Sequence, residues 1–155
     1  MFIRSFGAAS LLIAFCVTAA QAEKPLTAAK TMFKKSTHVV TGIAKEIYQH
    51  KVQKGNYEET HYVAEIQVDG VEKGDGIKVG QLIYVRYWGR RWTAAGNPEP
   101  GTNGHLPLAK KQQAYRVHLA KDAYDGFGTE KNDGGYNVWG VNGFVPLKKK
   151  VESKQ

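Results

Sequence analysis

Alternation of apolar and polar side chains over residues 62–71 is the feature that most restricts the fold of this chain. Tyr62, Ala64, Ile66 and Val68 fall on one side of this segment, and polar residues fall on the other. A period of two is typical of a β-strand with one buried face. The segment therefore predicts a strand that lies on a hydrophobic core.

Residues 82–88 predict a second strand, joined to the first around a turn at residues 73–76. This strand is apolar on both sides. Ile83, Val85 and Tyr87 face one way, and the opposite face carries Leu82, Tyr84, Arg86 and Trp88. Two aromatic rings that flank an arginine on one strand face are the most distinctive surface feature of the sequence.

Further strands are expected at residues 37–48, 114–119, 136–141 and 144–147. Gly42 interrupts the first of them, as a β-bulge or a sharp bend would. A single short helix is expected at residues 26–34, with Met32 and Phe33 facing the core. Long polar connections are expected at residues 49–60 and 122–135 and at the glycine- and proline-rich stretch described below.

Five or six short strands with at most one helix predict an all-β, mainly antiparallel fold. The strand count and the bend at Gly42 favour a small barrel of the OB type. The sequence divides into four parts: a signal peptide at 1–22, a basic segment at 23–36, one barrel domain at 37–147 and a basic tail at 148–155.

The first 22 residues predict export to the periplasm or the outside of the cell. Arg4 precedes an apolar run, which ends before Ala20-Gln21-Ala22, so cleavage is expected after Ala22. Phe15 stands where a lipoprotein signal would have a small residue, which argues against a lipid anchor at Cys16. No later segment is apolar enough to span a membrane.

The expected mature chain contains no cysteine, because Cys16 is the only one in the sequence. Its 133 residues suit one domain that is stabilised by its hydrophobic core rather than by disulfides. Thiol catalysis and cysteine-ligated metals are thereby excluded. We expect a monomer.

The formal charge of +8 lies mainly at the two ends of the chain. Residues 23–35 and residues 148–155 each contain four lysines and one glutamate, which leaves the barrel domain nearly neutral. Basic tails of this kind favour solubility or loose attraction to acidic polymers of the cell envelope. Specific recognition of nucleic acid is not predicted.

A resemblance follows from three stretches of sequence. His38-Val39-Val40-Thr41-Gly42-Ile43-Ala44, the strand that ends in Glu72-Lys73-Gly74, and Gln113-Ala114-Tyr115-Arg116-Val117-His118-Leu119 resemble the TIMP/netrin-like OB domains of exported bacterial proteins. The resemblance implies an OB-type fold. The animal inhibitors of that class ligate a target's zinc through an N-terminal cysteine. The expected mature chain lacks one, so inhibition is not implied.

The best candidate for a ligand-binding site is a group of aromatic and cationic residues on and after the second strand: Tyr84, Arg86, Trp88, Arg90, Arg91 and Trp92. Aromatic faces stack on sugar rings or bases, and the arginine fork binds carboxylates and phosphates. OB-type barrels bind oligosaccharides and oligonucleotides on such a face. In the alternative reading, Tyr84 and Trp88 pack beneath a loop with Arg86 between them.

That loop is expected at residues 89–111, which contain four glycines and three prolines. A connection of this length in a compact domain is usually functional or disordered. We expect it to form a lid or lip beside the candidate site.

The five histidines do not show the spacing of a metal site. His61 and His118 are expected to point outward and could become neighbours in a barrel, with Glu65 nearby. Asp122 and Asp125 could bind calcium, although they do not match the EF-hand pattern and turn formation explains them equally well. No metal site and no cofactor are predicted.

The mature chain would contain only Ser36 and Ser153 as serines, both at the edges of the fold, so nucleophilic catalysis is not predicted. The sequence therefore favours an exported binding module whose ligand is a glycan or a protein of the envelope or the exterior. Two alternatives remain open: a structural accessory protein without a ligand, and a small metal-dependent hydrolase.

Overall fold

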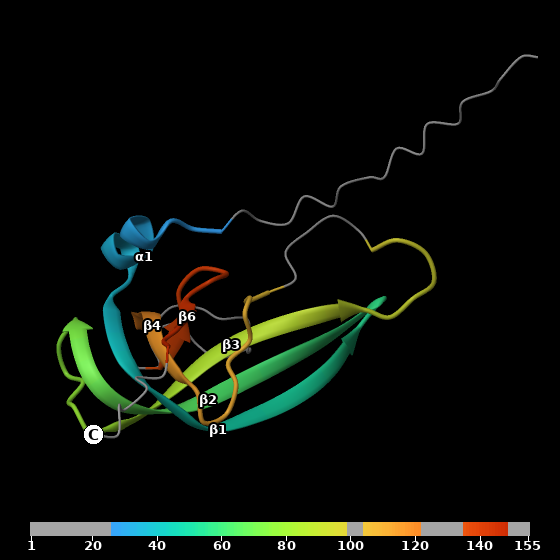
Figure 1. The fold of residues 1–155 in the computed structure, drawn as a ribbon. Helices are drawn as coiled ribbons and strands as arrows, with labels where there is room; N and C mark the ends of the chain where they lie inside the picture. The colour runs from blue at the N-terminus through green and yellow to red at the C-terminus, as the bar shows by residue number, and fades with distance from the viewer. Residues whose placement is uncertain (1–25, 99–103, 122–134, 149–155) are drawn as a thin grey trace, which may run out of the picture.

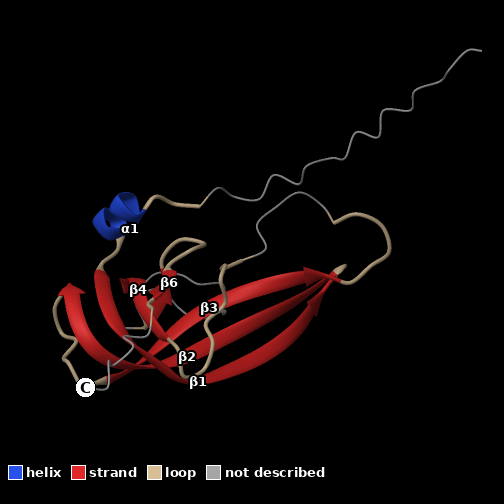
Figure 2. Ribbon diagram, viewed as in Figure 1, coloured by secondary structure: helices blue, strands red, loops and turns tan. Residues whose placement is uncertain are grey.

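A computed structural model describes residues 26–98, 104–121 and 135–148 of the protein. Figure 2 shows that this part of the chain consists mainly of strands joined by loops, with one short helix. The elements in chain order are α1 (Ala29–Lys35), β1 (His38–Lys54), β2 (Tyr57–Lys73), β3 (Leu82–Trp92), β4 (Ala114–Lys121), β5 (Tyr136–Val138) and β6 (Phe144–Pro146). The predicted all-β class is confirmed.

Five of the six strands close into a ring, in the order β1, β2, β3, β5, β4 and back to β1. Every pairing in the ring is antiparallel except the short one between β3 and β5. β6 pairs with β4 along the same edge as β5, at residues 115–117 where β5 takes residues 119–121, and its Phe144 is buried in the core. The ring has the number of strands expected for the predicted OB-type fold.

β1 pairs with β2 along one edge and with β4 along the other, and it bends within this stretch. Its register with β2 shifts at three places, one of them between Thr41 and Gly42. A Cβ atom at position 42 would collide with the carbonyl oxygen of Gln67 on β2, so only glycine fits there. The bend predicted at Gly42 is confirmed, and it turns the strand across the ring.

The hydrophobic core fills the ring with side chains that alternate along each strand. Val40, Ala64 and Val85 have no exposed surface. At one end of the core, Phe144 packs edge-on against Tyr87 and Tyr115, with ring centres 4.9 Å and 5.4 Å apart. Such aromatic pairs add to the stability that burial provides.

Beyond the ring, β1, β2 and β3 continue together as a three-stranded sheet that projects to one side, which we call the arm (Figure 1). A two-residue turn at Gly55 and Asn56 joins β1 to β2. Residues 49–60 were expected to be a polar connection, and this prediction is wrong. They are polar because this stretch of sheet lies beyond the core, where a strand needs no buried face.

α1 lies at the opposite end of the molecule from the tip of the arm (Figure 1). Met32 is buried, as predicted, whereas Phe33 is 43% exposed. The ammonium group of Lys73 on β2 donates hydrogen bonds to the carbonyls of Phe33, Lys34 and Ser36, at 2.8, 3.0 and 2.6 Å. Lys73 thus binds the carbonyl groups at the end of the helix, where a cation is favoured.

Several boundaries differ from those predicted. β3 continues to Trp92, so the long connection covers residues 93–113 rather than 89–111. β5 stops at Val138 and does not reach Val141. Most of the polar connection predicted at residues 122–135 lies outside the described residues.

Candidate binding cleft

The sheet formed by β1, β2 and β3 has two faces, and the six predicted site residues are divided between them. Tyr84, Arg86 and Trp88 lie opposite Glu65, Val63 and His61 of β2, on the face that points away from the core. Tyr84 is 55% exposed, and the other two side chains are half-buried. The expectation that these three share one face agrees with the register.

Arg90 and Trp92 continue along this outer face, opposite Glu59 and Tyr57. The guanidinium of Arg90 lies 4.4 Å from the ring centre of Tyr57, and the Tyr57 ring meets Trp92 edge-on at 4.9 Å. Stacking of this kind stabilises the tip of the arm.

Arg91 lies on the other face, opposite Glu58, because neighbouring residues of a strand point in opposite directions. It was predicted to belong to the same site as Tyr84 and Trp88. The register separates it from them.

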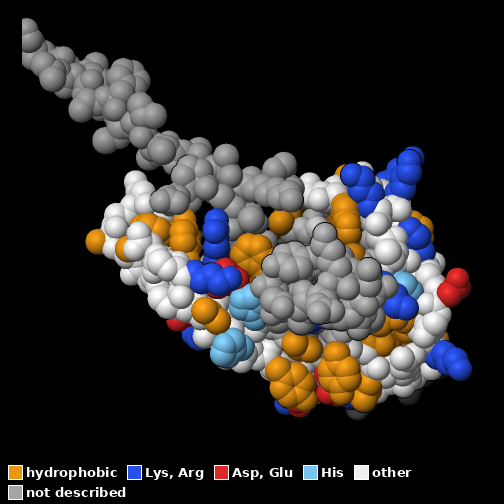
Figure 3. Space-filling model, turned by 180° about the vertical axis from the view of Figure 1, so that it is seen from behind, with side chains coloured by type: hydrophobic (Ala, Val, Ile, Leu, Met, Phe, Trp, Pro, Cys, Tyr) orange, Lys and Arg blue, Asp and Glu red, His pale blue; other side chains and the backbone are white. Residues whose placement is uncertain are grey.

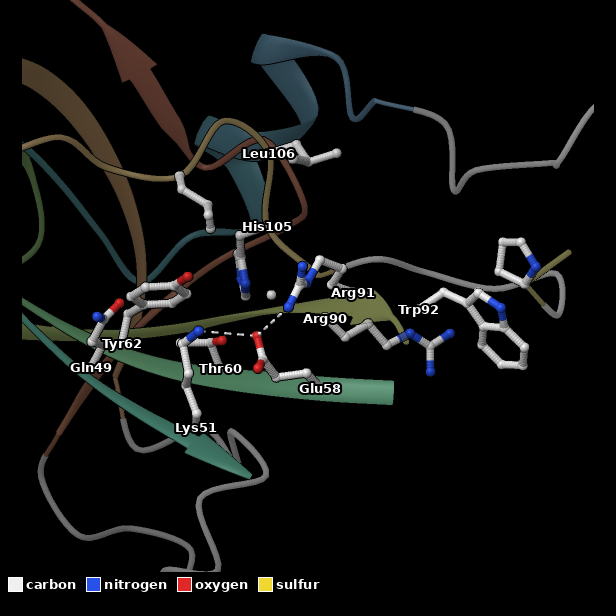
Figure 4. A pocket seen from close by; sticks show the side chains of 13 residues that line it. Gln49, Lys51, Glu58, Thr60, Tyr62, Arg90, Arg91, Trp92, His105 and Leu106 are labelled. Carbon is white, nitrogen blue, oxygen red and sulfur yellow. Dashed lines mark hydrogen bonds and ion pairs between the residues drawn. The ribbon is translucent and has the colours of Figure 1, made fainter. Parts of the chain in front are cut away.

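The inner face of the arm forms the floor of a cleft of about 740 Å³, and Pro98, His105, Leu106 and Leu108 of the connection between β3 and β4 form its wall (Figure 4). Arg90 and Trp92, at the edge of the arm, also line it. The lining residues are Gln49, Lys51, Glu58, Thr60, Tyr62, Gly89, Arg90, Arg91, Trp92, Pro98, His105, Leu106 and Leu108. Three of the six predicted site residues therefore border the cleft, and Tyr84, Arg86 and Trp88 do not.

A charged group occupies the floor. Lys51 Nζ lies 3.1 Å and Arg91 Nη2 lies 3.3 Å from the same oxygen, Oε1 of Glu58. The hydrogen bond from Lys51 is the main cause that lowers the pKa of Glu58 below its usual range. With Arg90, the cleft has three cations and one carboxylate, so its net charge is positive.

The wall is attached to the edge of β3. Gly104 forms a β-bridge with Gly89, and the backbone N–H of His105 donates to the carbonyl of Trp88 at 2.9 Å. Gly104 has a φ of +94°, and a Cβ atom there would collide with the Trp88 carbonyl oxygen. Glycine is thus required by both backbone conformation and space.

The His105 side chain continues this attachment. Its Nδ1 lies 3.2 Å from the backbone nitrogen of Trp88, and its Nε2 lies 3.3 Å from the carbonyl oxygen of Val138. Burial lowers the pKa of His105, which favours a neutral imidazole. Nδ1 also lies 3.1 Å from the carbonyl oxygen of Trp88, so the ring contacts β3 through Nδ1 and the end of β5 through Nε2. His105 therefore joins β3 to the end of β5.

The inner end of the cleft is aromatic. Tyr62 lines it and stacks on Tyr87, with ring centres 4.9 Å apart and planes 12° from parallel. Tyr87 is almost fully buried, and burial raises the pKa of its hydroxyl above the usual range. Among the described residues, this hydroxyl has no hydrogen-bond partner. The stack holds Tyr62 in a defined orientation beside the cleft.

Sequence reasoning missed Lys51, Glu58, Tyr62 and His105 as lining residues. The first two lie in the segment that was expected to be a polar connection. Gly55-Asn56 is a recognised two-residue hairpin signal and could have revealed the arm.

His61 and His118 do not form a cluster. His61 is buried on β2, with Nε2 2.7 Å from Glu59 Oε1. His118 is 3% exposed, and its Nδ1 lies 3.4 Å from Ser36 Oγ. His118 of β4 lies opposite Val39 of β1, and Val39 in turn lies opposite Lys73 of β2. Lys73 is twelve residues along β2 from His61, so the two histidines are far apart. Both histidines lie on strand faces that point away from the core, as expected, but the two are not neighbours, so that part of the prediction is wrong.

Within the described ranges, no three His, Cys, Asp or Glu side chains are grouped closely enough to hold a metal ion. Asp122 and Asp125, the candidate calcium ligands, lie outside those ranges. Ser36 is buried, and its hydroxyl donates to the carbonyl of Met32 at 2.5 Å. That hydroxyl is engaged in the end of α1 rather than presented to a cleft.

No protein family, curated protein or solved structure matches this chain. The resemblance to TIMP/netrin-like domains stays a prediction. Among the residues that the structure describes, none forms a helix long and apolar enough to cross a bilayer.

Proposed function

We propose that this protein is an exported binding module that captures a glycan or protein ligand in the cleft between the arm and the wall formed by Pro98, His105, Leu106 and Leu108. The observation that supports this most strongly is the position of the cleft. It lies where three strands extend beyond the core and where charged, aromatic and apolar side chains meet (Figure 4).

The size and place of the cleft support the proposal. Ligand sites commonly have volumes of roughly 300–1,000 Å³, and the cleft has about 740 Å³. OB-type barrels bind oligomeric ligands on the face formed by their second and third strands. Here β2 and β3 provide most of the floor, and the expected export signal directs the ligand class to molecules of the envelope or exterior.

The surface gives less support to the other candidates. On the face seen in Figure 3, lysine and arginine side chains are scattered rather than joined in a continuous stripe. Nucleic-acid backbones are usually followed by such a stripe. A metal-dependent hydrolase would need a ligand group that the described residues do not form.

The test is a two-dimensional amide NMR titration of the purified protein with pooled glycans and short peptides. We expect the shifts to cluster on cleft residues and to disappear in an Arg91→Ala, Leu106→Ala double variant. Both side chains are exposed, so thermal stability should hardly change. Tyr84→Ala, on the outer face, is the matched control and should bind normally. Shifts confined to Tyr84, Arg86 and Trp88 would place the site on the outer face and refute the cleft.

A further inference from the structure

The charge of the cleft carries a more specific inference, which rests on the binding function proposed above. We propose that the cleft takes an acidic glycan and that a carboxylate on a sugar ring is bound between Lys51 and Arg91. Three features of the cleft favour such a ligand: its charged floor, its apolar walls and the already paired strand edge beside it.

The floor presents two cationic heads that are close together and accessible. Both contact one oxygen of Glu58, while their side chains are 54% and 73% exposed. One carboxylate balances one of these two charges, and Arg90 adds a third cation to the lining. A second carboxylate, supplied by a ligand, would accept charge-assisted hydrogen bonds from the same two heads.

The remaining lining suits a ring with flat apolar faces and polar edges. Tyr62, Trp92 and Leu106 offer aromatic or aliphatic surface, and Leu106 is 45% exposed. Gln49 and Thr60 add amide and hydroxyl groups at the floor. A sugar ring has C–H groups that pack on apolar surface and hydroxyls that need such partners.

An acidic peptide fits this site less well. Extended peptides commonly bind by adding a strand to a free sheet edge, where main-chain hydrogen bonds supply affinity. Beside the cleft, the edge of β3 at Trp88 and Gly89 is already paired with Gly104 and His105. A ligand in the cleft is therefore recognised through side chains, which favours the glycan.

The experiment measures the binding of three probes to the purified protein by calorimetry and amide NMR. The probes are oligogalacturonate, its methyl ester, which lacks the charge, and oligoglutamate, which has carboxylates without a sugar ring. Two charge-matched double variants accompany them. Lys51→Gln with Arg91→Gln alters the cleft, and Lys34→Gln with Lys78→Gln removes the same charge from exposed positions elsewhere.

We expect oligogalacturonate to bind in the cleft at least about tenfold more tightly than its ester or oligoglutamate, the effect of one charge-assisted contact. The cleft variant should lose about tenfold or more in affinity, and the control should stay within about twofold. Equal binding of the ester in the cleft would overturn the acidic ligand but leave the binding function intact. Equal or tighter binding of oligoglutamate would replace the glycan by an acidic peptide.

Two other results would also refute the inference. An equal loss of affinity in both double variants would mean that the attraction is generic charge rather than a site. If none of the three probes shifts the cleft residues, the acidic glycan is refuted. If pooled neutral glycans and peptides fail there as well, the proposed binding function falls with it.

Discussion

β1, β2 and β3 run through both the ring and the arm, but the two regions are stabilised in different ways. Inside the ring, side chains such as Val40, Ala64 and Val85 are wholly buried. In the arm, Lys51 and Arg91 are mostly exposed, and the contacts between strands are ion pairs and aromatic stacking. Hydrophobic burial contributes far more stability per residue than exposed ion pairs do.

This difference between the ring and the arm indicates which part of the fold can carry a binding site. The arm begins beyond Arg86, the last residue of β3 that pairs with β5, and beyond Val63, its partner on β2. Past that level β1 to β3 are no longer part of the closed ring, so arm residues need not be apolar. They are available for recognition, and four predictions follow from this division of roles.

The largest expected effect separates core from arm. Phe144→Ala removes a ring that packs on Tyr87 and Tyr115, and should lower the free energy of unfolding by about 3–5 kcal/mol. Val52→Ala on β1 in the arm should cost less than about 1 kcal/mol, because that side chain is only partly buried. Chemical denaturation measures both. Comparable losses would mean that the arm is an integral part of the core.

The second prediction concerns the wall of the cleft. Gly104→Ala and Gly96→Ala both place a side chain at positive φ, but only at position 104 would the Cβ atom collide with β3. The Gly104 variant should therefore lose about 1–3 kcal/mol more stability than the Gly96 variant. It should also weaken ligand binding, because the wall is displaced. Equal stabilities would show that the wall is not held by close approach to β3.

The accuracy of the predictions from sequence also differs between the ring and the arm. Strands were identified wherever one face packs on the core, as at residues 62–71 and 114–119. The arm was missed because a strand outside the core has no period of two in hydrophobicity to detect. The ring order could not be predicted either, since it depends on pairings between distant segments.

The buried His118 shows another limit. The alternation on β4 correctly placed Tyr115, Val117 and Leu119 in the core, and it placed His118 on the outside of the ring. Ser36, at the end of α1, covers that outside position. Alternation along a strand shows which side chains face the core of its own sheet. It does not show whether another element covers the opposite face.

The candidate site was predicted in part. Alternation placed Tyr84, Arg86 and Trp88 on one face, and it also implied that Arg91 faces away from Arg90 and Trp92. Grouping all six residues by their closeness in sequence overlooked that consequence. His105 could not be found from the sequence, because its position depends on a connection that folds back along β3.

The third prediction is a dependence of stability on pH. Burial lowers the pKa of His105 in the folded state below the ordinary value of about 6.5 expected when the chain is unfolded. The unfolded state therefore binds more protons between those two values. Stability is full above about pH 6.5, falls as the pH drops toward the folded pKa, and levels off below it.

Denaturation at a series of pH values should show this decline, with a slope of at most about 1.4 kcal/mol per pH unit from His105. The pKa of buried His118 is also lowered, mainly by burial, so its contribution must be separated. His105→Gln and His118→Gln are compared for that purpose. If the slope persists unchanged in His105→Gln, the attachment of the wall is not the source of the pH dependence.

The smallest expected effect tests whether Glu58 supports the arm or competes with a ligand. Its carboxylate occupies donors of Lys51 and Arg91 that a ligand carboxylate would also use. Glu58→Gln should leave the denaturation midpoint unchanged, because the pairs are solvent-exposed. It should tighten oligogalacturonate binding by up to about threefold at low salt, and screening should remove the gain at high salt. A loss of affinity would instead show that Glu58 positions the two cations, and the arm would then be a preorganised site rather than a simple positive surface.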